Sequence, residues 1–312
     1  MKTQSRKLKW IVCVRVPATT ANLGSGFDGL GLALALYNTF TVVTGAAHLA
    51  LVVRGEGAES LPTTKDNLFY RALEAGAGRR IEEPVRIVIN NEIPVERGLG
   101  SSASAVIGGL IAGSVLAGRV LSREEILKLA LDFEPHPDNL AAALHGGLVL
   151  SALTESFVTA VPVRIANGWR AVAAVPDHPV STAQARKVLP DTYEREDVVF
   201  NLTRAPLVVA ALQAGNLDWL RTGVQDRIHQ PYRQRLVTGL KEVLAWAKSR
   251  PEAAAFLSGS GSTMMVLARG RYRKIAREVE TLLRRHEVRA RMLHLRIDTQ
   301  GARVMPVAIG DL

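Results

Sequence analysis

The residues best suited to do chemistry form a glycine- and serine-rich turn, Pro-Val-Glu-Arg-Gly-Leu-Gly-Ser-Ser-Ala-Ser, at residues 94–104. Glycine lets the backbone come close to an anion, and the free N–H groups at a helix N-terminus bind phosphate. Ser101 and Ser102 add hydroxyls that can bond a phosphate oxygen or bind Mg²⁺, which prefers oxygen ligands. The segment therefore predicts a phosphate-binding turn. The simpler alternative is a glycine turn in which serine caps a helix.

Two other kinds of phosphate-binding site are excluded by their own patterns. The turn lacks Gly-Lys-Ser/Thr, so it is not a P-loop. Residues 24–29 match G-x-G-x-x-G, but the alternation of large and small residues that follows them, at 30–37, is typical of a strand rather than a helix. No acidic residue lies about 20 positions further on to hold a ribose. A dinucleotide-binding site is therefore not expected here.

The elements that must hold the turn begin with a strand predicted at 84–90 and a helix predicted at 101–117. Further strands are predicted at 11–16, 32–43, 49–54, 147–153, 158–165, 171–176, 254–257, 264–267, 288–295 and 304–309, and further helices at 67–76, from Ser122 on, at 198–214, at 234–248 and within 269–291. Strands and helices alternate without a regular βαβ order, which favours an α+β fold. A length of 312 residues suits two domains, predicted as 1–160 and 161–312.

The composition indicates a globular protein, because 47% of the residues are hydrophobic and can form a sizeable core. No apolar segment reaches the roughly 20 residues that span a bilayer. The basic N-terminus is not followed by a signal-type apolar region, and the single cysteine, Cys13, excludes an internal disulfide. We therefore expect a cytoplasmic protein that does not bind membranes.

The net charge of +10 raises the question of a nucleic-acid partner. Residues 269–291 hold nine basic and three acidic residues, but their apolar positions follow the period of an amphipathic helix whose inward residues are Ile275, Val279, Leu282 and Leu283. Only Tyr272 lies among the charges as a residue that could stack on a base. The stretch is better explained as a solvated helix face, and we expect no nucleic-acid partner.

Together with 98–104, residues 17–28 (Pro-Ala-Thr-Thr-Ala-Asn-Leu-Gly-Ser-Gly-Phe-Asp) resemble the GHMP kinase superfamily, and within it the homoserine kinase branch. The supporting segments are 134–139 (Glu-Pro-His-Pro-Asp-Asn), 181–190 (Ser-Thr-Ala-Gln-Ala-Arg-Lys-Val-Leu-Pro), 226–233 (Asp-Arg-Ile-His-Gln-Pro-Tyr-Arg), 258–263 (Ser-Gly-Ser-Gly-Ser-Thr) and 298–304 (Asp-Thr-Gln-Gly-Ala-Arg-Val). The resemblance runs in order from residue 11 almost to the end. It departs at Pro135, where the family usually has Gly, and at Ser262, where it usually has Pro.

The resemblance implies a two-domain GHMP kinase fold with a ribosomal-protein-S5-like N-terminal domain and a ferredoxin-like C-terminal domain. It also implies a kinase that uses ATP and Mg²⁺ to phosphorylate the side-chain hydroxyl of L-homoserine to O-phospho-L-homoserine, a step of threonine biosynthesis. ATP and L-homoserine are then the small-molecule partners. A homodimer is left open.

By the same resemblance, each site residue receives a role. The ATP phosphates would be held by Pro94, Val95, Glu96, Arg97, Gly98, Leu99, Gly100, Ser101, Ser102, Ala103 and Ser104, the adenine or its ribose would be contacted by Asn67, and Mg²⁺ would be bound by Ser102 and Glu134. The amino acid would be bound by Arg186 and Arg233 at its carboxylate, by Asp28 at its ammonium, by Asn22 and Asn139 at its hydroxyl, and by His136 and Thr182 along the pocket. Asn22, Asn139 and Arg186 are the predicted catalytic residues.

Three alternatives to this mechanism and function are open from the sequence. Asp138 lies next to Asn139 and could be a general base, whereas our hypothesis is catalysis by orientation and electrostatics without an essential carboxylate base. A GHMP kinase acting on mevalonate or shikimate would have no ammonium for Asp28 to pair with. An RNA-binding module would require sequence-selective binding, because any basic protein retains RNA at low salt.

Overall fold

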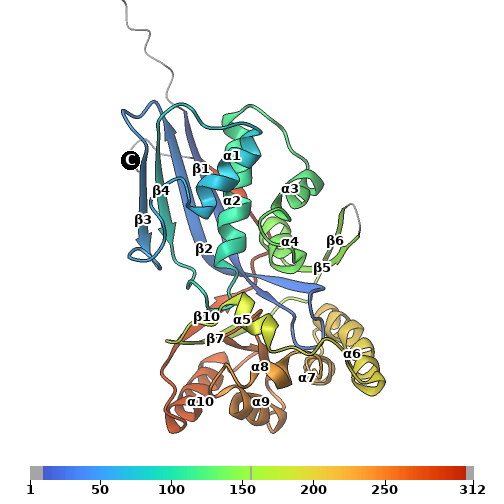
Figure 1. The fold of residues 1–312 in the computed structure, drawn as a ribbon. Helices are drawn as coiled ribbons and strands as arrows, with labels where there is room; N and C mark the ends of the chain where they lie inside the picture. The colour runs from blue at the N-terminus through green and yellow to red at the C-terminus, as the bar shows by residue number, and fades with distance from the viewer. Residues whose placement is uncertain (1–9, 155–156, 307–312) are drawn as a thin grey trace, which may run out of the picture.

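The structure is a computed structural model that describes residues 10–154 and 157–306, and these residues form two sheets. Figure 1 shows the first sheet with its helices in the upper part of the molecule and the second sheet with its helices in the lower part. The prediction of an α+β fold is confirmed, because strands and helices mix within each part. Their order along the chain does not follow a regular βαβ pattern.

The first sheet has the strand order β11-β1-β2-β4-β3, with β5 paired to β2 and β6 to β5. Its strands are β1 (Ile11–Ala21), β2 (Leu30–Thr44), β3 (Ala50–Gly55), β4 (Val85–Asn91), β5 (Leu148–Leu153), β6 (Val158–Val163) and β11 (Arg303–Met305). Of the strand pairs that the described residues form in this sheet, only β3–β4 is parallel. The helices that pack with this sheet are α1 (Leu68–Ala77), α2 (Ser101–Leu116), α3 (Arg123–Ala130) and α4 (Pro137–His145).

Helix α2 can lie close to its neighbours because it is rich in small residues. A Cβ atom built on Gly113 would clash with the backbone oxygen of Leu73 in α1, and one on Gly76 of α1 would clash with that of Leu110 in α2. Only glycine permits this approach. The close packing fixes the C-terminal half of α2 against α1, and the glycine- and serine-rich turn leads into the other end of the same helix.

The second sheet has the order β10-β7-β9-β8, formed by β7 (Arg170–Pro176), β8 (Ala254–Leu257), β9 (Met264–Ala268) and β10 (Ala290–Arg296). The helices of this half are α5 (Thr182–Lys187), α6 (Arg195–Ala214), α7 (Leu217–Gly223), α8 (Gln230–Arg233), α9 (Leu240–Lys248) and α10 (Tyr272–Arg285). In α10 the residues Ile275, Val279 and Leu283 are buried and Leu282 is half-buried, so the predicted amphipathic helix is confirmed.

Most predicted elements are confirmed, and the differences have local causes. The helix predicted at 234–248 begins only at Leu240, because the chain turns at Gly239, whose φ is +86°. The strand predicted at 304–309 is β11, and residues 307–309 lie outside the described residues. The helices α4, α5, α7 and α8 were not predicted. The predicted division at residue 160 stays a prediction; β6 crosses it, and β11 returns to the first sheet.

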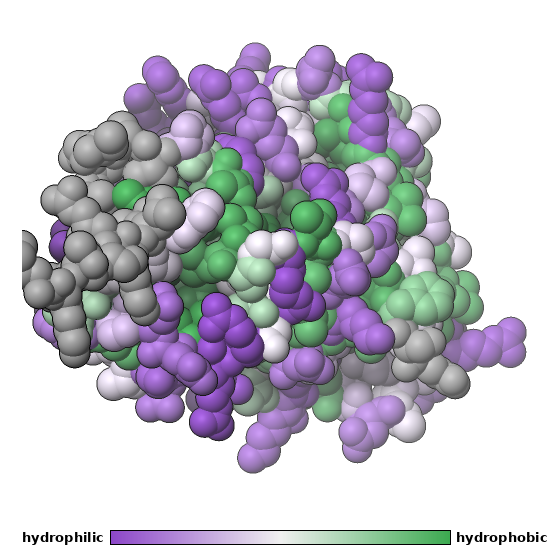
Figure 2. Space-filling model, turned by 90° about the horizontal axis from the view of Figure 1, so that it is seen from above, coloured by the Kyte–Doolittle hydropathy of each residue, from purple (hydrophilic) through white to green (hydrophobic). Residues whose placement is uncertain are grey.

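Hydrophilic and hydrophobic side chains both reach the surface of the molecule. Figure 2 shows one face from above, where hydrophilic side chains lie along the upper and lower edges and hydrophobic ones gather between them. Among the described residues, no helix is both long and apolar enough to cross a membrane.

Candidate active site

One cleft of about 680 Å³ brings together residues that lie far apart in the sequence. It is lined by nearly all of the predicted site residues: Asn22, Asp28, Asn67, the turn residues from Pro94 to Ala103, Glu134, His136, Asn139, Thr182, Arg186 and Arg233. Ser104 is the exception, because it is buried behind the turn. Its hydroxyl donates to the carbonyl of Ser101 at 2.7 Å and accepts from the amide of Asn38 at 2.8 Å. It therefore braces the first turn of α2 from behind.

The turn itself depends on two glycines. Gly98 and Gly100 both have φ of +71°, a conformation that side chains with a Cβ rarely adopt. A Cβ on Gly98 would clash with the carbonyl oxygen of Ser258, and one on Gly100 with the hydroxyl of Thr19. The turn is thus pressed between β1 and the 258–263 turn of the second half.

Three hydrogen bonds to the carbonyl groups of residues 97–99 hold this part of the turn in place. The Thr19 amide donates to the carbonyl of Leu99 at 3.0 Å, the Ser258 hydroxyl donates to that of Gly98 at 2.6 Å, and the Thr263 amide donates to that of Arg97 at 3.1 Å. All of them use carbonyl groups, so none consumes an amide of the first α2 turn. The first intrahelical bond runs from the Ser104 amide to the carbonyl of Gly100 at 2.9 Å.

The N-terminus of α2 therefore offers free amide groups to the cleft. Among the described residues no side chain caps this helix, and its first turn holds no acidic residue. The amides of residues 101–103 and the helix dipole together form an anion-binding end.

Ser102 and Glu134 lie together at the wall of the cleft, as expected for a shared cation. Burial raises the pKa of Glu134, and its hydrogen bond with the Ser102 hydroxyl acts in the opposite direction. A hydroxyl and a carboxylate suit Mg²⁺, which keeps water and phosphate oxygens as further ligands. In residues 10–154 and 157–306 no cluster of three or more His, Cys, Asp or Glu side chains is arranged for a metal, so this is a site with few protein ligands.

The two positions that depart from the family pattern lie beside site residues. Pro135 also lines the cleft, and Glu134 beside it still reaches Ser102. Ser262 is buried, and its hydroxyl donates to the carbonyl of His178 at 2.7 Å. The serine at this position thus connects the 258–263 turn to the loop that precedes α5.

Asp28 and Arg186 form an ion pair at the other end of the cleft. The Nη2 of Arg186 lies 2.6 Å from Oδ1 of Asp28, and both side chains are about one-third exposed. The Nε of Arg186 is buried and has no partner among the described residues. A donor atom with an unmet hydrogen bond beside a cleft is suited to bind an incoming acceptor.

Arg233 is almost fully buried, and its guanidinium is held by the protein. Nε donates to the carbonyl of Ala185 at 3.1 Å, and Nη1 donates to that of Gly259 at 2.9 Å. Burial, together with the nearby charge of Arg186, lowers the pKa of Arg233 to about 10, although the charge of Asp28 acts in the opposite direction. Arg233 therefore remains a cation at neutral pH.

The aromatic ring of Phe27 lies beside both guanidinium groups. Its centroid is 5.4 Å from Cζ of Arg186 and 5.3 Å from Cζ of Arg233, within the range of a cation–π interaction. Phe27 was not predicted as a site residue. Its signal in the sequence is its place next to Asp28 in the 17–28 segment.

Asn22 joins the loop of Asp28 to the second half of the chain. It has a positive φ of 72°; its Nδ2 donates to the carbonyl of Gly259 at 3.0 Å and its Oδ1 accepts from the Asp28 amide at 3.0 Å. An amide side chain retains one N–H and one lone pair after these two bonds. Asn22 thus positions Asp28 and keeps capacity for a ligand.

Asn139 and Asp138 lie at the start of α4. The Oδ1 of Asn139 accepts from the Thr19 hydroxyl at 2.7 Å, and Oδ1 of Asp138 accepts from the Asn139 amide at 2.7 Å. Asp138 is 3% exposed, and burial, with the negative charge of Asp28 as the next cause, raises its pKa to about 7. A carboxyl with this pKa is present in both protonation states near neutral pH.

The remaining predicted residues lie on the cleft wall, and Asn67 also has a structural use. Its side chain caps α1, accepting from the Phe69 amide at 3.0 Å and donating to the carbonyl of Pro62 at 2.6 Å. His136 precedes α4, and burial together with the charge of Arg186 lowers its pKa. Thr182 begins α5, whose N-cap is Ser181.

Comparison with known proteins identifies the class to which this fold and cleft belong. The family of GHMP kinase N-terminal domains matches residues 67–147, and that of GHMP kinase C-terminal domains matches residues 208–285. The two-domain GHMP kinase fold is thereby confirmed. The crystal structure of a homoserine kinase from Cytophaga hutchinsonii superposes with a TM-score of 0.83 over 98% of this chain and 100% of that one, at 24% identity.

Similar sequences are found among the homoserine kinases. That of Desulfitobacterium hafniense is 40% identical over 299 residues, which are 95% of this chain and 100% of that protein. That of Moorella thermoacetica is 38% identical over 294 residues, 94% of this chain and 99% of that protein. The chain therefore belongs to the homoserine kinase family of the GHMP kinases.

Proposed function

We propose that the protein transfers the terminal phosphoryl group of ATP to the side-chain hydroxyl of L-homoserine and forms O-phospho-L-homoserine. The observation that carries the proposal is the single cleft in which the 98–104 turn faces Asp28, Arg186 and Arg233. The anion-binding N-terminus of α2 lies at one side of this cleft, and the ion pair of Asp28 and Arg186 lies with Arg233 at the other. This arrangement suits a nucleotide next to a zwitterionic amino acid.

The nucleotide phosphates lie against the amides of residues 101–103 and the two glycines of the turn. Ser102 and Glu134 would hold Mg²⁺, which neutralises phosphate charge when it is bound. Asn67 lies where the cleft can receive the adenine or its ribose. Ser104 contributes by bracing α2 rather than by lining the cleft.

The amino acid lies between Asp28 and the two arginines. Its carboxylate accepts from the unpartnered Nε of Arg186 and from Arg233, because guanidinium groups match a carboxylate in shape and charge. Its ammonium pairs with Asp28. His136 and Thr182 limit the pocket along its side.

The transfer step uses orientation and charge. The hydroxyl oxygen of homoserine bonds to the γ-phosphorus while the bond to the ADP oxygen breaks, and the hydroxyl proton passes to a phosphate oxygen. Asn22 and Asn139 orient the hydroxyl, and Arg186 and the amides at the start of α2 stabilise the charges that develop. In this mechanism Asp138 positions Asn139 and is not an essential base.

A coupled assay of ADP formation tests the proposal. Homoserine, threonine, mevalonate and shikimate are compared at the same concentration, with and without Mg²⁺. We expect turnover with homoserine that depends on Mg²⁺, and at least tenfold less with the others. Equal or greater turnover with mevalonate or shikimate would refute the proposal.

Asp28→Asn tests the assignment of the ammonium. A hydrogen bond to a charged group contributes about 1.5–3 kcal/mol, so we expect the KM for homoserine to rise by about 10- to 100-fold. The KM for ATP should stay within about twofold. Asp66→Asn is the control, because Asp66 lines the same cleft near Asn67 instead. An unchanged homoserine KM in Asp28→Asn would contradict the assignment.

A further inference from the structure

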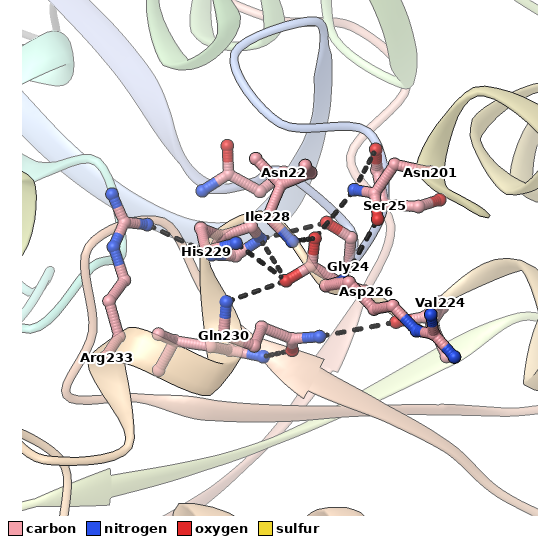
Figure 3. A network of polar contacts seen from close by, with 12 residues as sticks. Asn22, Gly24, Ser25, Asn201, Val224, Asp226, Ile228, His229, Gln230 and Arg233 are labelled. Atoms are coloured by element: carbon pink, nitrogen blue, oxygen red, sulfur yellow. Dashed lines mark hydrogen bonds and ion pairs between the residues drawn. The ribbon is translucent and has the colours of Figure 1, made fainter. Parts of the chain in front are cut away.

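A buried polar network surrounds the ring of His229, a residue without a role in the proposed mechanism (Figure 3). Its Nε2 lies 2.9 Å from the carbonyl oxygen of Gly24, and its Nδ1 lies 3.2 Å from Nη1 of Arg233. The ring also stacks on Phe27, with centroids 5.1 Å apart and planes inclined by 20°. One side chain thus touches the loop that leads to Asp28 and one of the two carboxylate-binding arginines.

The two ring contacts determine the protonation of His229. A carbonyl oxygen only accepts, so Nε2 must carry the proton that it donates to Gly24. A guanidinium only donates, so Nδ1 must be the acceptor for Arg233. Both conditions hold only for the neutral ring with its proton on Nε2.

We infer that His229 is a positioning residue for homoserine binding: its unprotonated Nδ1 accepts from Nη1 of Arg233 and fixes the guanidinium toward the substrate carboxylate. With Nε held by Ala185 and Nη1 held by Gly259 and His229, Nη2 is the nitrogen of Arg233 without a partner among the described residues. Arg233 lines the cleft, so this nitrogen is the one left for a ligand. The inference rests on the proposed function, because the proposed substrate, homoserine, carries the carboxylate that Arg233 would bind.

Asp226 holds the ring in place from the other side. Its buried carboxylate accepts from the backbone amides of Ile228, His229 and Gln230 at 3.0, 3.0 and 2.7 Å, and from Nδ2 of Asn201 at 2.7 Å. Four donors converge on one carboxylate, so the start of α8, which carries Arg233, is rigid.

Burial favours the neutral form of His229. It is the largest cause of the lowered pKa of this ring; the charge of Asp226 acts in the opposite direction, the charge of Arg233 lowers the pKa, and the bond to Gly24 and the charge of Asp28 raise it. Protonation would place an N–H of His229 against an N–H of Arg233. The neutral acceptor is therefore the form that the surroundings of the ring support.

Two substitutions separate the two ring contacts. In His229→Asn the Oδ1 stands at the position of Nδ1 and can still accept from Arg233, but nothing reaches Gly24. In His229→Gln the Nε2 stands at the position of the ring Nε2 and can still donate to Gly24, but Arg233 loses its acceptor. Both variants lose the stack on Phe27, so they differ only in the ring contact that each keeps: the contact with Arg233 in His229→Asn and the contact with Gly24 in His229→Gln.

The assay compares homoserine with the amino alcohol in which CH₂OH replaces its carboxylate. We expect His229→Gln to raise the KM for homoserine about tenfold and His229→Asn by at most about threefold, with the KM for ATP unchanged in both. The preference for homoserine over the amino alcohol should fall in the Gln variant only. Retention by Gln and loss by Asn, or equal loss in both, would overturn the inference.

A second measurement, made on the wild type, does not depend on activity. In wild-type protein labelled with ¹⁵N-histidine, the signals absent from His229→Asn belong to His229, and we expect protonated Nε2 with unprotonated Nδ1. If His229→Asn does not fold, the assignment comes from through-bond spectra of the wild type. A proton on Nδ1 would overturn the inference. Absence of any turnover by the wild type would refute the proposed function while leaving this result intact.

Discussion

Asp138→Asn tests both the electrostatics of the site and the absence of a carboxylate base. The carboxyl of Asp138 has a pKa of about 7 in the folded protein, raised chiefly by burial, against an ordinary value of 3.8. A raised carboxyl pKa stabilises the folded state at low pH, and this contribution is lost as the pH rises through about 7. From pH 5 to pH 9 the wild type loses about 3 kcal/mol of unfolding free energy through this group. The amide side chain cannot ionise, and its oxygen can still accept from Asn139.

Urea unfolding of the ligand-free protein at pH 5 and pH 9 measures the effect. The unfolding free energy of Asp138→Asn relative to wild type should rise by about 3 kcal/mol between these values. The control is Asp132→Asn, since Asp132 is exposed to solvent and its replacement should have no such dependence. A relative stability that does not change with pH would refute the argument from burial.

The same variant tests the mechanism. Without an essential base, kcat at saturating homoserine should stay within about tenfold of wild type. A loss of about 10³ or more in a folded variant would show that Asp138 removes the hydroxyl proton, and orientation alone would then be insufficient.

Two further predictions concern the nucleotide end. Gly98→Ala should raise the KM for ATP at least about tenfold, because the added Cβ meets the Ser258 carbonyl. It should also lower the unfolding free energy by more than the about 1–2 kcal/mol that a left-handed backbone costs a residue with a side chain. Gly118→Ala is the control: Gly118 has a φ of +64° and open space around it, so this variant should lose only that backbone contribution and keep the KM for ATP. Equal effects of the two would contradict the close approach. Glu134→Gln should raise the Mg²⁺ concentration for half-maximal activity at least about tenfold, whereas Glu124→Gln, at an exposed position of α3, should leave it unchanged. An unchanged Mg²⁺ requirement in Glu134→Gln would remove this residue from the metal site.

Local patterns predicted the parts of the fold that local forces determine. The alternation at 84–90 predicted β4, and Ser122 followed by Glu125 predicted the start of α3, where both bonds of the capping box are formed. The helices α4, α5 and α8 escaped prediction because they are short and begin beside proline or serine, where the periodic signal has no room to repeat. The turn before α9 could not be predicted from hydrophobic periodicity, because it depends on the backbone conformation of one residue, Gly239.

The residues of the candidate site could be selected from the sequence, but their mutual contacts could not. The resemblance assigned Asp28 to an ammonium and Arg186 to a carboxylate, yet nothing in the sequence showed that the two pair with each other at 2.6 Å. Their separation of 158 residues is bridged only by the tertiary structure. In the same way, the buried contacts of Phe27 and His229 with the arginines depend on loops that meet only in the folded chain.

The internal pair of Asp28 and Arg186 has a consequence for selectivity. A ligand must separate the two charges or leave one of them without a partner in a partly buried cleft, which is costly. A zwitterion can replace the internal pair by two new ones, because its ammonium satisfies Asp28 while its carboxylate satisfies Arg186 and Arg233. A simple anion such as mevalonate or shikimate could satisfy only the arginines and would leave Asp28 unpaired. The pair thus penalises ligands that lack an ammonium, even where their hydroxyl could reach the phosphate-binding turn.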